Sequence, residues 1–140
     1  MNKKKIIIIG CGVSGIAMGI HSLRKGYDIM ILEKEKTLGG VWYDKNYQNI
    51  ELQTTPISYS YSLDEFKSKG LFASGDEILT YLNFNFKKYK LQKYTKFNAE
   101  AISLKKTKEH KYLIGYNVGN NTKYDSCDHV VFCCGVYNIP

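Results

Sequence analysis

The chain has 140 residues, a length that fits one domain of ordinary size, and its hydrophobic fraction of 44% is enough for a core. Its formal net charge is +7, but the lysines are scattered except over residues 87–93 and no recognition motif accompanies them, so we do not expect a nucleic-acid-binding protein. No apolar run approaches the roughly 18 residues of a membrane-spanning helix, so no transmembrane segment is expected.

The first predicted element is a strand at residues 6–9. This run of four isoleucines is typical of a strand that is buried on both faces of a parallel sheet. The lysines before it resemble the start of a signal peptide, but the apolar run ends at Gly10 and no small-residue cleavage pattern follows. We therefore expect a buried strand and a cytoplasmic protein.

A helix and a second strand follow. Residues 16–25 have apolar side chains at helical spacing, and Gly26 is placed to end the helix. Residues 27–32 form a second apolar run, which ends at Glu33. From the glycine pair at residues 39–40 to about residue 73 no period is sustained, which predicts an irregular and functional segment.

The remaining elements are one helix and several strands. Ser74 and Glu77 have the spacing of a capping box at the start of a helix over about residues 76–90. Residues 97–104 are a candidate strand, and residues 111–118 and 123–126 predict a hairpin around residues 119–121. A buried run at 129–134 ends at Gly135. The predicted fold class is α/β, a Rossmann-like domain whose parallel sheet carries a β-hairpin or meander insertion.

The glycines that follow the first strand indicate a dinucleotide. Gly10, Gly12 and Gly15 have the G-x-G-x-x-G spacing between a strand and a helix. Gly10 permits the tight turn, Gly12 lets the backbone approach a diphosphate closely, and Gly15 lets the helix pack near the strand. The helix N-terminus then offers N–H groups and a partial positive charge to the phosphates. The alternative is that these glycines only make a tight turn.

An acidic residue and a glycine pair further along the chain indicate which dinucleotide is bound. Glu33 lies about twenty residues beyond the glycines, where a carboxylate binds ribose hydroxyls and repels a 2′-phosphate; the alternative is a solvated strand end. Gly39 and Gly40 suit the longer cofactor of a flavoprotein, whereas a simple NAD dehydrogenase does not need them. Trp42 is expected to pack on that cofactor, or else to be an ordinary core residue.

These motifs resemble those of the flavin-containing monooxygenases and their Baeyer–Villiger relatives. The resemblance rests on residues 10–15, on Glu33 and on Gly-Gly-Val-Trp at residues 39–42. It extends to segments 52–56, 72–82, 128–135 and 136–140, and so covers nearly the whole chain. It implies that FAD would be lined by Gly10, Cys11, Gly12, Val13, Ser14, Gly15, Glu33, Gly40, Val41, Trp42, Gln53, Thr54 and Gly135. Two departures are Gln53, where the family has Asn, and Cys133-Cys134, where it has Ala-Thr.

The resemblance also implies an activity, and it indicates that a module of the family does not occur in these residues. Family members use FAD, NADPH and oxygen to oxidise soft nucleophilic small molecules such as amines and sulfides. The NADP module, with a second glycine motif, does not occur in residues 1–140, so we expect the N-terminal part of an FAD-binding domain. Two alternatives stay open: a truncated, catalytically inactive FAD-binding relative, and an NAD-binding module of another oxidoreductase.

Few side chains in the sequence suggest any other chemistry. The cysteines lack C-x-x-C spacing and paired histidines, so no metal site is expected. Cys11 is expected to fill the loop, and Cys133 and Cys134 to act as small hydrophobes in a strand. The three histidines are interpreted as structural or solvated; they are His21, His110 and His129. No catalytic residue is assigned.

Overall fold

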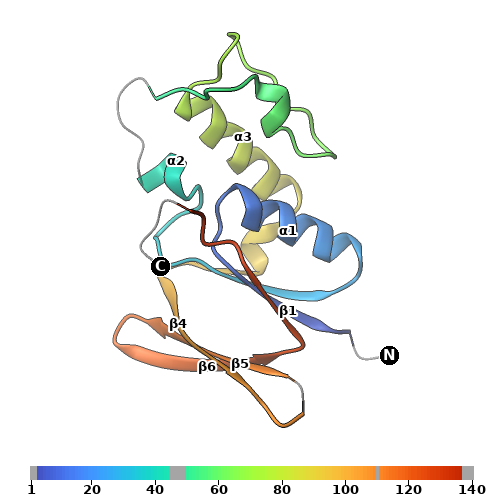
Figure 1. Cartoon of the computed structure of the whole chain (residues 1–140), viewed down its shortest axis with the longest axis vertical. Helices are drawn as coiled ribbons and strands as arrows, with labels where there is room; N and C mark the ends of the chain where they lie inside the picture. Colours follow the sequence, from blue (N-terminus) through green and yellow to red (C-terminus); the bar gives the residue numbers. More distant parts are fainter. Residues whose placement is uncertain (1–2, 45–49, 110, 137–140) are drawn as a thin grey trace.

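The structure is a computed structural model that describes residues 3–44, 50–109 and 111–136 (Figure 1). His110 and the last four residues of the 136–140 segment lie outside the described residues. The elements follow in the order β1 (Lys5–Ile9), α1 (Val13–Arg24), β2 (Asp28–Leu32), α2 (Val41–Asp44), η1 (a 3-10 helix, Pro56–Tyr59), α3 (Gly75–Lys88), η2 (a 3-10 helix, Leu91–Lys93), β3 (Thr95–Lys96), β4 (Ala99–Lys106), β5 (Tyr112–Val118), β6 (Asn121–Cys127) and β7 (His129–Phe132).

A parallel sheet organises the fold. Its strand order is β3-β2-β1-β7, and every neighbouring pair is parallel. Helix α1 carries the chain from β1 to β2, while the return through α3 and the meander brings β7 to the other side of β1. In such sheets ligands bind outside the carboxyl ends of the strands, where the strand order reverses. Here that position is the end of β1, and the predicted fold class is confirmed.

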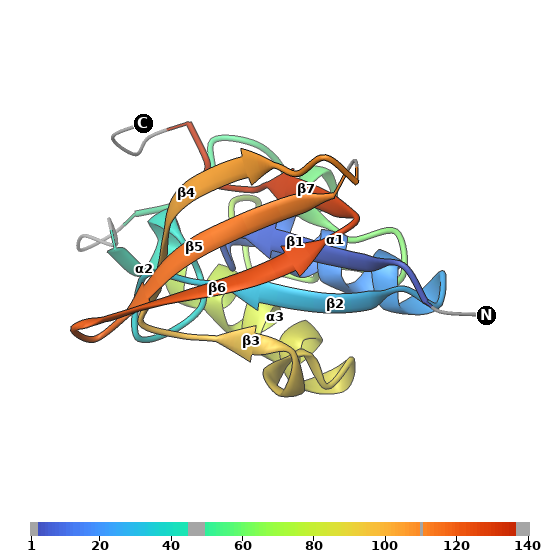
Figure 2. The ribbon, with the colours of Figure 1, turned by 90° about the horizontal axis from the view of Figure 1, so that it is seen from below.

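Both faces of the parallel sheet are covered. Ile6 and Ile8 of β1 pack into the core beneath the helices, whereas Ile7 packs against the antiparallel sheet β4-β5-β6. Figure 2 shows β4, β5 and β6 in front of the parallel strands, with α1 and α3 behind. Because side chains alternate along a strand, burial on both faces requires a continuous apolar run, as predicted for residues 6–9.

The predicted helix signals occur where expected. Gly26 follows α1 with a φ of +81°, and its N–H donates to the Leu23 carbonyl. At the start of α3, Ser74 Oγ accepts from the Glu77 N–H at 3.3 Å, and the Glu77 carboxylate accepts from the Ser74 N–H at 3.0 Å. The capping box is therefore confirmed. Both pairs satisfy N–H groups that the helix cannot satisfy itself.

Ser74→Ala is expected to lower the free energy of unfolding by about 1 kcal/mol, because one helix N–H loses its capping acceptor. Urea denaturation measures the change. Thr80→Ala, on the exposed side of the same helix, is the matched control and should change stability by less than about 0.5 kcal/mol. Equal stability of wild type and Ser74→Ala would contradict the capping role.

Three predictions about segments need correction. The run at 129–134 is not buried: Phe132 is 61% exposed and Cys134 is exposed, because β7 is the outer strand of the described sheet. The candidate strand at 97–104 begins only at Ala99 and continues to Lys106 as β4, since Asn98 has a φ of +51° just before it. The segment expected to be irregular contains two short helices, α2 and η1.

Candidate functional site at the carboxyl edge of the parallel sheet

The turn after β1 has glycines that the fold itself requires. Gly10 has a φ of +103°, and a β-carbon there would lie 2.5 Å from the Cys133 carbonyl oxygen. A β-carbon on Gly15 would lie 2.0 Å from the Gly10 carbonyl oxygen. Real β-carbons do not approach backbone atoms so closely, so α1 can pack on this turn only without side chains at these positions.

Gly12 differs, because a β-carbon there would approach no atom of the protein more closely than an ordinary van der Waals contact. Its φ is −84°, which any residue adopts, and a β-carbon there would make only an ordinary 3.6 Å contact with the Gly40 α-carbon. The two glycine motifs thus face each other. The Gly39 N–H holds them together by donating to the Cys11 carbonyl at 3.0 Å. The result is a bare backbone surface that a ligand can approach closely.

Helix α1 adds electrostatic character to this surface. Its N-cap is Gly12, which supplies no side-chain acceptor, and its first turn contains no acidic residue. The first N–H groups of a helix have no partner within the helix and carry a partial positive charge. Ser14, in this first turn, is exposed. The arrangement suits an anion such as a diphosphate.

Glu33 lies at the end of β2 beside the glycine turn and is only 5% exposed. One carboxylate oxygen accepts from the Cys11 N–H at 2.6 Å, and the other accepts from the Glu35 N–H at 2.9 Å. The alternative of a solvated strand end is therefore wrong. Because each carboxylate oxygen can accept a further hydrogen bond, these contacts leave capacity for a ribose hydroxyl.

The Cys11 thiol lies inside the turn and is fully buried. Burial raises its pKa to about 12, and the neighbouring Glu33 carboxylate adds to the effect. Since the thiolate is the nucleophilic form, Cys11 is unreactive at neutral pH. The expectation that Cys134 is a buried small hydrophobe is wrong, because its side chain is exposed.

Iodoacetamide at pH 8 is expected to modify Cys134 first, whereas Cys11 and Cys127, both buried, react only after unfolding. Mass spectrometry of peptides from the native and the urea-unfolded protein measures the order. Modification of native Cys11 at the rate seen in urea would contradict the buried position of its thiol.

Trp42 is placed mainly in the core. It is 8% exposed, belongs to the cluster beneath the helices, and donates its indole N–H to the Tyr59 hydroxyl at 2.8 Å. The two rings meet edge to face at 5.7 Å. The alternative of a core tryptophan therefore describes most of this side chain. Val41, its neighbour in α2, is half-buried.

The remaining predicted residues lie at the periphery. Gln53 and Thr54 are exposed just before η1, and the Thr54 hydroxyl pairs with the Ser58 hydroxyl at 2.8 Å. Gly135 follows β7, exposed, with a φ of +75°. The structure thus brings the two glycine motifs and Glu33 into contact. Within the described part of the chain, no hydrogen bond holds Gln53, Thr54 or Gly135 against them.

Sequence reasoning missed Tyr61 as a residue of this site. Its hydroxyl donates to the Val13 carbonyl at 2.8 Å, so a residue of the irregular segment contacts the first residue of α1. The only signal in the sequence is a tyrosine-rich stretch without periodicity, which does not specify a partner.

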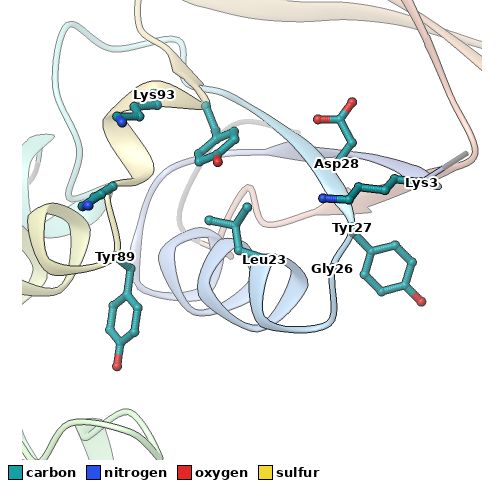
Figure 3. A pocket seen from close by; sticks show the side chains of 9 residues that line it. Lys3, Leu23, Gly26, Tyr27, Asp28, Tyr89 and Lys93 are labelled. Atoms are coloured by element: carbon teal, nitrogen blue, oxygen red, sulfur yellow. The ribbon is translucent and has the colours of Figure 1, made fainter.

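A depression of about 650 Å³ lies at the opposite edge of the sheet near Gly26 and Asp28 (Figure 3). In Figure 3 the side chains of Tyr27, Tyr89 and Lys93 point outward rather than toward a common centre. Ligand sites need convergent polar groups, so this depression is not the candidate site. Within the described ranges no group of histidine, cysteine or acidic side chains could hold a metal ion.

Comparison with known proteins identifies the relatives of this site. A family described as "NAD(P)-binding Rossmann-like domain" matches residues 8–68. A putative flavin-containing monooxygenase of Arabidopsis thaliana is 27% identical over 95% of this chain and 33% of its own length. A Baeyer–Villiger monooxygenase of Pseudomonas aeruginosa is 36% identical over 71% of this chain and 19% of its own length. The chain is related to the flavin-containing monooxygenases.

The structural comparison agrees with these sequence relatives. A solved steroid monooxygenase bound to NADP superimposes with a TM-score of 0.87 at 22% identity, over 99% of this chain and 28% of that protein. This likeness shows the fold. The chain spans between 19% and 33% of the length of the two curated relatives. In the part of the chain that the structure describes, no helix combines the length and apolar character needed to cross a bilayer.

Proposed function

We propose that the chain binds FAD at the carboxyl edge of its parallel sheet. The observation that carries the proposal is the bare contact between Gly12 and Gly40, because nothing in the protein itself requires glycine at position 12. A ligand whose diphosphate lies directly against this backbone would explain why position 12 is a glycine. The second glycine motif at this contact favours a flavin dinucleotide, and the names of the relatives support it.

The chemical groups at this site match those of the cofactor. The first turn of α1, at Val13 and Ser14, offers N–H groups to the diphosphate, while Glu33 can accept from ribose hydroxyls. The Glu33 carboxylate would repel a 2′-phosphate, so NADP is disfavoured here. The wider proposed set is Gly10, Cys11, Gly12, Val13, Ser14, Gly15, Glu33, Gly40, Val41, Trp42, Gln53, Thr54 and Gly135.

We further propose that these residues are the N-terminal FAD-binding part of an NADPH-using monooxygenase. Bound flavin supplies the redox chemistry, and the protein supplies binding, orientation and exclusion of water. Residues 1–140 contain no second G-x-G-x-x-G, so the proposed sites for NADPH and for a soft nucleophilic substrate lie outside them. No nucleic acid is proposed as a partner. The alternative is a relative that binds FAD without turnover.

The absorption spectrum of the purified chain tests the proposal. We expect flavin bands, and chromatography of the heat-released cofactor should yield FAD rather than FMN. NADPH oxidation by these 140 residues alone should equal the buffer rate, because they contain no second G-x-G-x-x-G motif to bind the hydride donor. A colourless protein that takes up NAD and not FAD would instead support an NAD-binding module, the alternative consistent with the matched family description.

A further inference from the structure

A turn from the irregular segment contacts the N-terminal end of α1. The Asp64 N–H donates to the Tyr61 carbonyl at 3.1 Å and closes residues 61–64 into a turn. From this turn the Tyr61 hydroxyl reaches Val13, the first residue of α1, at 2.8 Å. Tyr61 lies 48 positions away from Val13 in the sequence, so this contact joins two separate parts of the fold.

The turn is itself fixed to α3. The Tyr61 N–H donates to the Tyr81 hydroxyl at 2.6 Å, and that hydroxyl donates to the Asp64 carbonyl at 2.5 Å. The Asp64 carboxylate accepts from the Tyr89 hydroxyl at 2.7 Å and also from Lys88. Lys88 and Tyr89 hold the pKa of Asp64 below its usual range against the opposing effect of burial, so the carboxylate is charged at neutral pH. Tyr61 is therefore fixed by hydrogen bonds at its backbone N–H, its backbone carbonyl and its hydroxyl.

The Tyr61 phenol remains a donor. Burial, followed by the nearby Tyr81, Cys11 and Tyr59, raises its pKa above the usual range. The phenol is therefore protonated at neutral pH. Its ring packs against the core cluster that contains Cys11 of the glycine turn.

The contact acts on one particular peptide group. The Val13 carbonyl and the Ser14 N–H belong to the same planar unit, so fixing the oxygen also fixes the direction of the N–H. A hydrogen bond received by the carbonyl polarises the peptide and strengthens its N–H as a donor. Ser14 lies in the first turn of α1, next to the N-cap Gly12, where N–H groups point out of the N-terminal end of the helix.

We propose that Tyr61 is a positioning residue that orients and strengthens the Ser14 N–H for the cofactor diphosphate. The inference rests on the proposed FAD site and adds to it a residue outside the glycine motifs. Tyr61→Phe keeps the ring and removes only the hydroxyl. It should weaken FAD binding about three- to tenfold, the range of one hydrogen bond.

The test measures the FAD dissociation constant by flavin fluorescence, together with the Ser14 amide proton shift by NMR in the cofactor-free protein. In Tyr61→Phe the Ser14 amide should move to lower ppm, as expected for a weaker donor. Tyr124→Phe is the matched control, because it removes the hydroxyl of an exposed phenol on β6, which lies on the other side of the parallel sheet from α1. It should leave the Ser14 amide shift unchanged and the dissociation constant within twofold of the wild-type value.

An unmoved Ser14 amide, or equal losses of affinity in both variants, would overturn the inference while leaving the FAD site intact. Failure of the wild-type chain to bind FAD would instead remove the proposed function, so the two failures are distinguishable. If Tyr61→Phe does not fold, a measurement on the wild type tests the inference instead. Exchange of the Tyr61 hydroxyl proton should slow when FAD binds, because the Tyr61–Val13 contact and the contact of the Ser14 N–H with FAD strengthen each other reciprocally. An unchanged exchange rate would overturn the inference.

Discussion

Gly12→Ala is expected to raise the dissociation constant for FAD by about 100-fold, roughly 2.7 kcal/mol. The added methyl group would project from the bare surface that Gly12 shares with Gly40, where the diphosphate needs close approach to the backbone. The fold should survive, because the φ of −84° suits alanine and the new contact to Gly40 is an ordinary 3.6 Å. Stability should change by less than about 1 kcal/mol, since only the N-cap residue is altered.

Flavin fluorescence titration measures this loss, and circular dichroism verifies the fold of the variant. Gly70→Ala is the control, because it lies in an exposed part of the segment before α3 and its φ is not positive. It should bind FAD as the wild type does. Unimpaired binding by well-folded Gly12→Ala would show that the diphosphate does not lie on this surface.

Gly15→Ala is expected to have the opposite pattern, a large loss of stability. Its β-carbon would lie 2.0 Å from the carbonyl oxygen and 2.9 Å from the carbonyl carbon of Gly10, and backbone atoms in a tight turn cannot move aside cheaply. Overpacking of this kind costs about 3 kcal/mol. Thermal or urea unfolding measures it, with Gly70→Ala again as control. A Gly15→Ala protein as stable as wild type would mean that α1 does not pack on the turn so closely.

The two glycines show what the motif alone can predict. The spacing of Gly10, Gly12 and Gly15 between a strand and a helix predicts that all three are needed, and it assigns a role to each. Only the structure separates the two that the fold requires from the one it leaves bare. The requirement at Gly15 comes from the Gly10 carbonyl within the motif, whereas the surroundings of Gly10 and Gly12 depend on atoms of Cys133 and Gly40. These partners come from distant segments, and no local pattern specifies them.

Some helices and strands could be predicted from the sequence because neighbouring residues determine them. Four consecutive isoleucines predict a strand covered on both faces, and the Ser74–Glu77 pair predicts a helix start. The run at 129–134 shows the limit of that reasoning. Its apolar pattern matches a buried strand, but burial depends on what lies beside the strand, and β7 is the outer strand here.

The sequence predicted the glycine turn and Glu33, but it did not predict the residues that contact them from distant segments. The motif placed Glu33 beside the turn, but its hydrogen bonds to the Cys11 and Glu35 N–H groups depend on how β2 ends. Tyr61 was missed because its contact with Val13 forms only when a segment without periodicity folds back over α1. Contacts of this kind depend on tertiary packing, which propensity and spacing do not encode.

The position of the cofactor is tested most directly by following backbone amide signals in NMR while FAD is added. Binding at the carboxyl edge predicts that the signals of Gly12, Ser14, Glu33 and Gly40 shift in saturable fashion. Amides of the depression at the opposite edge, such as Gly26, should stay in place. Saturable shifts at Gly26 with unmoved signals at Gly12 and Gly40 would contradict the proposed site.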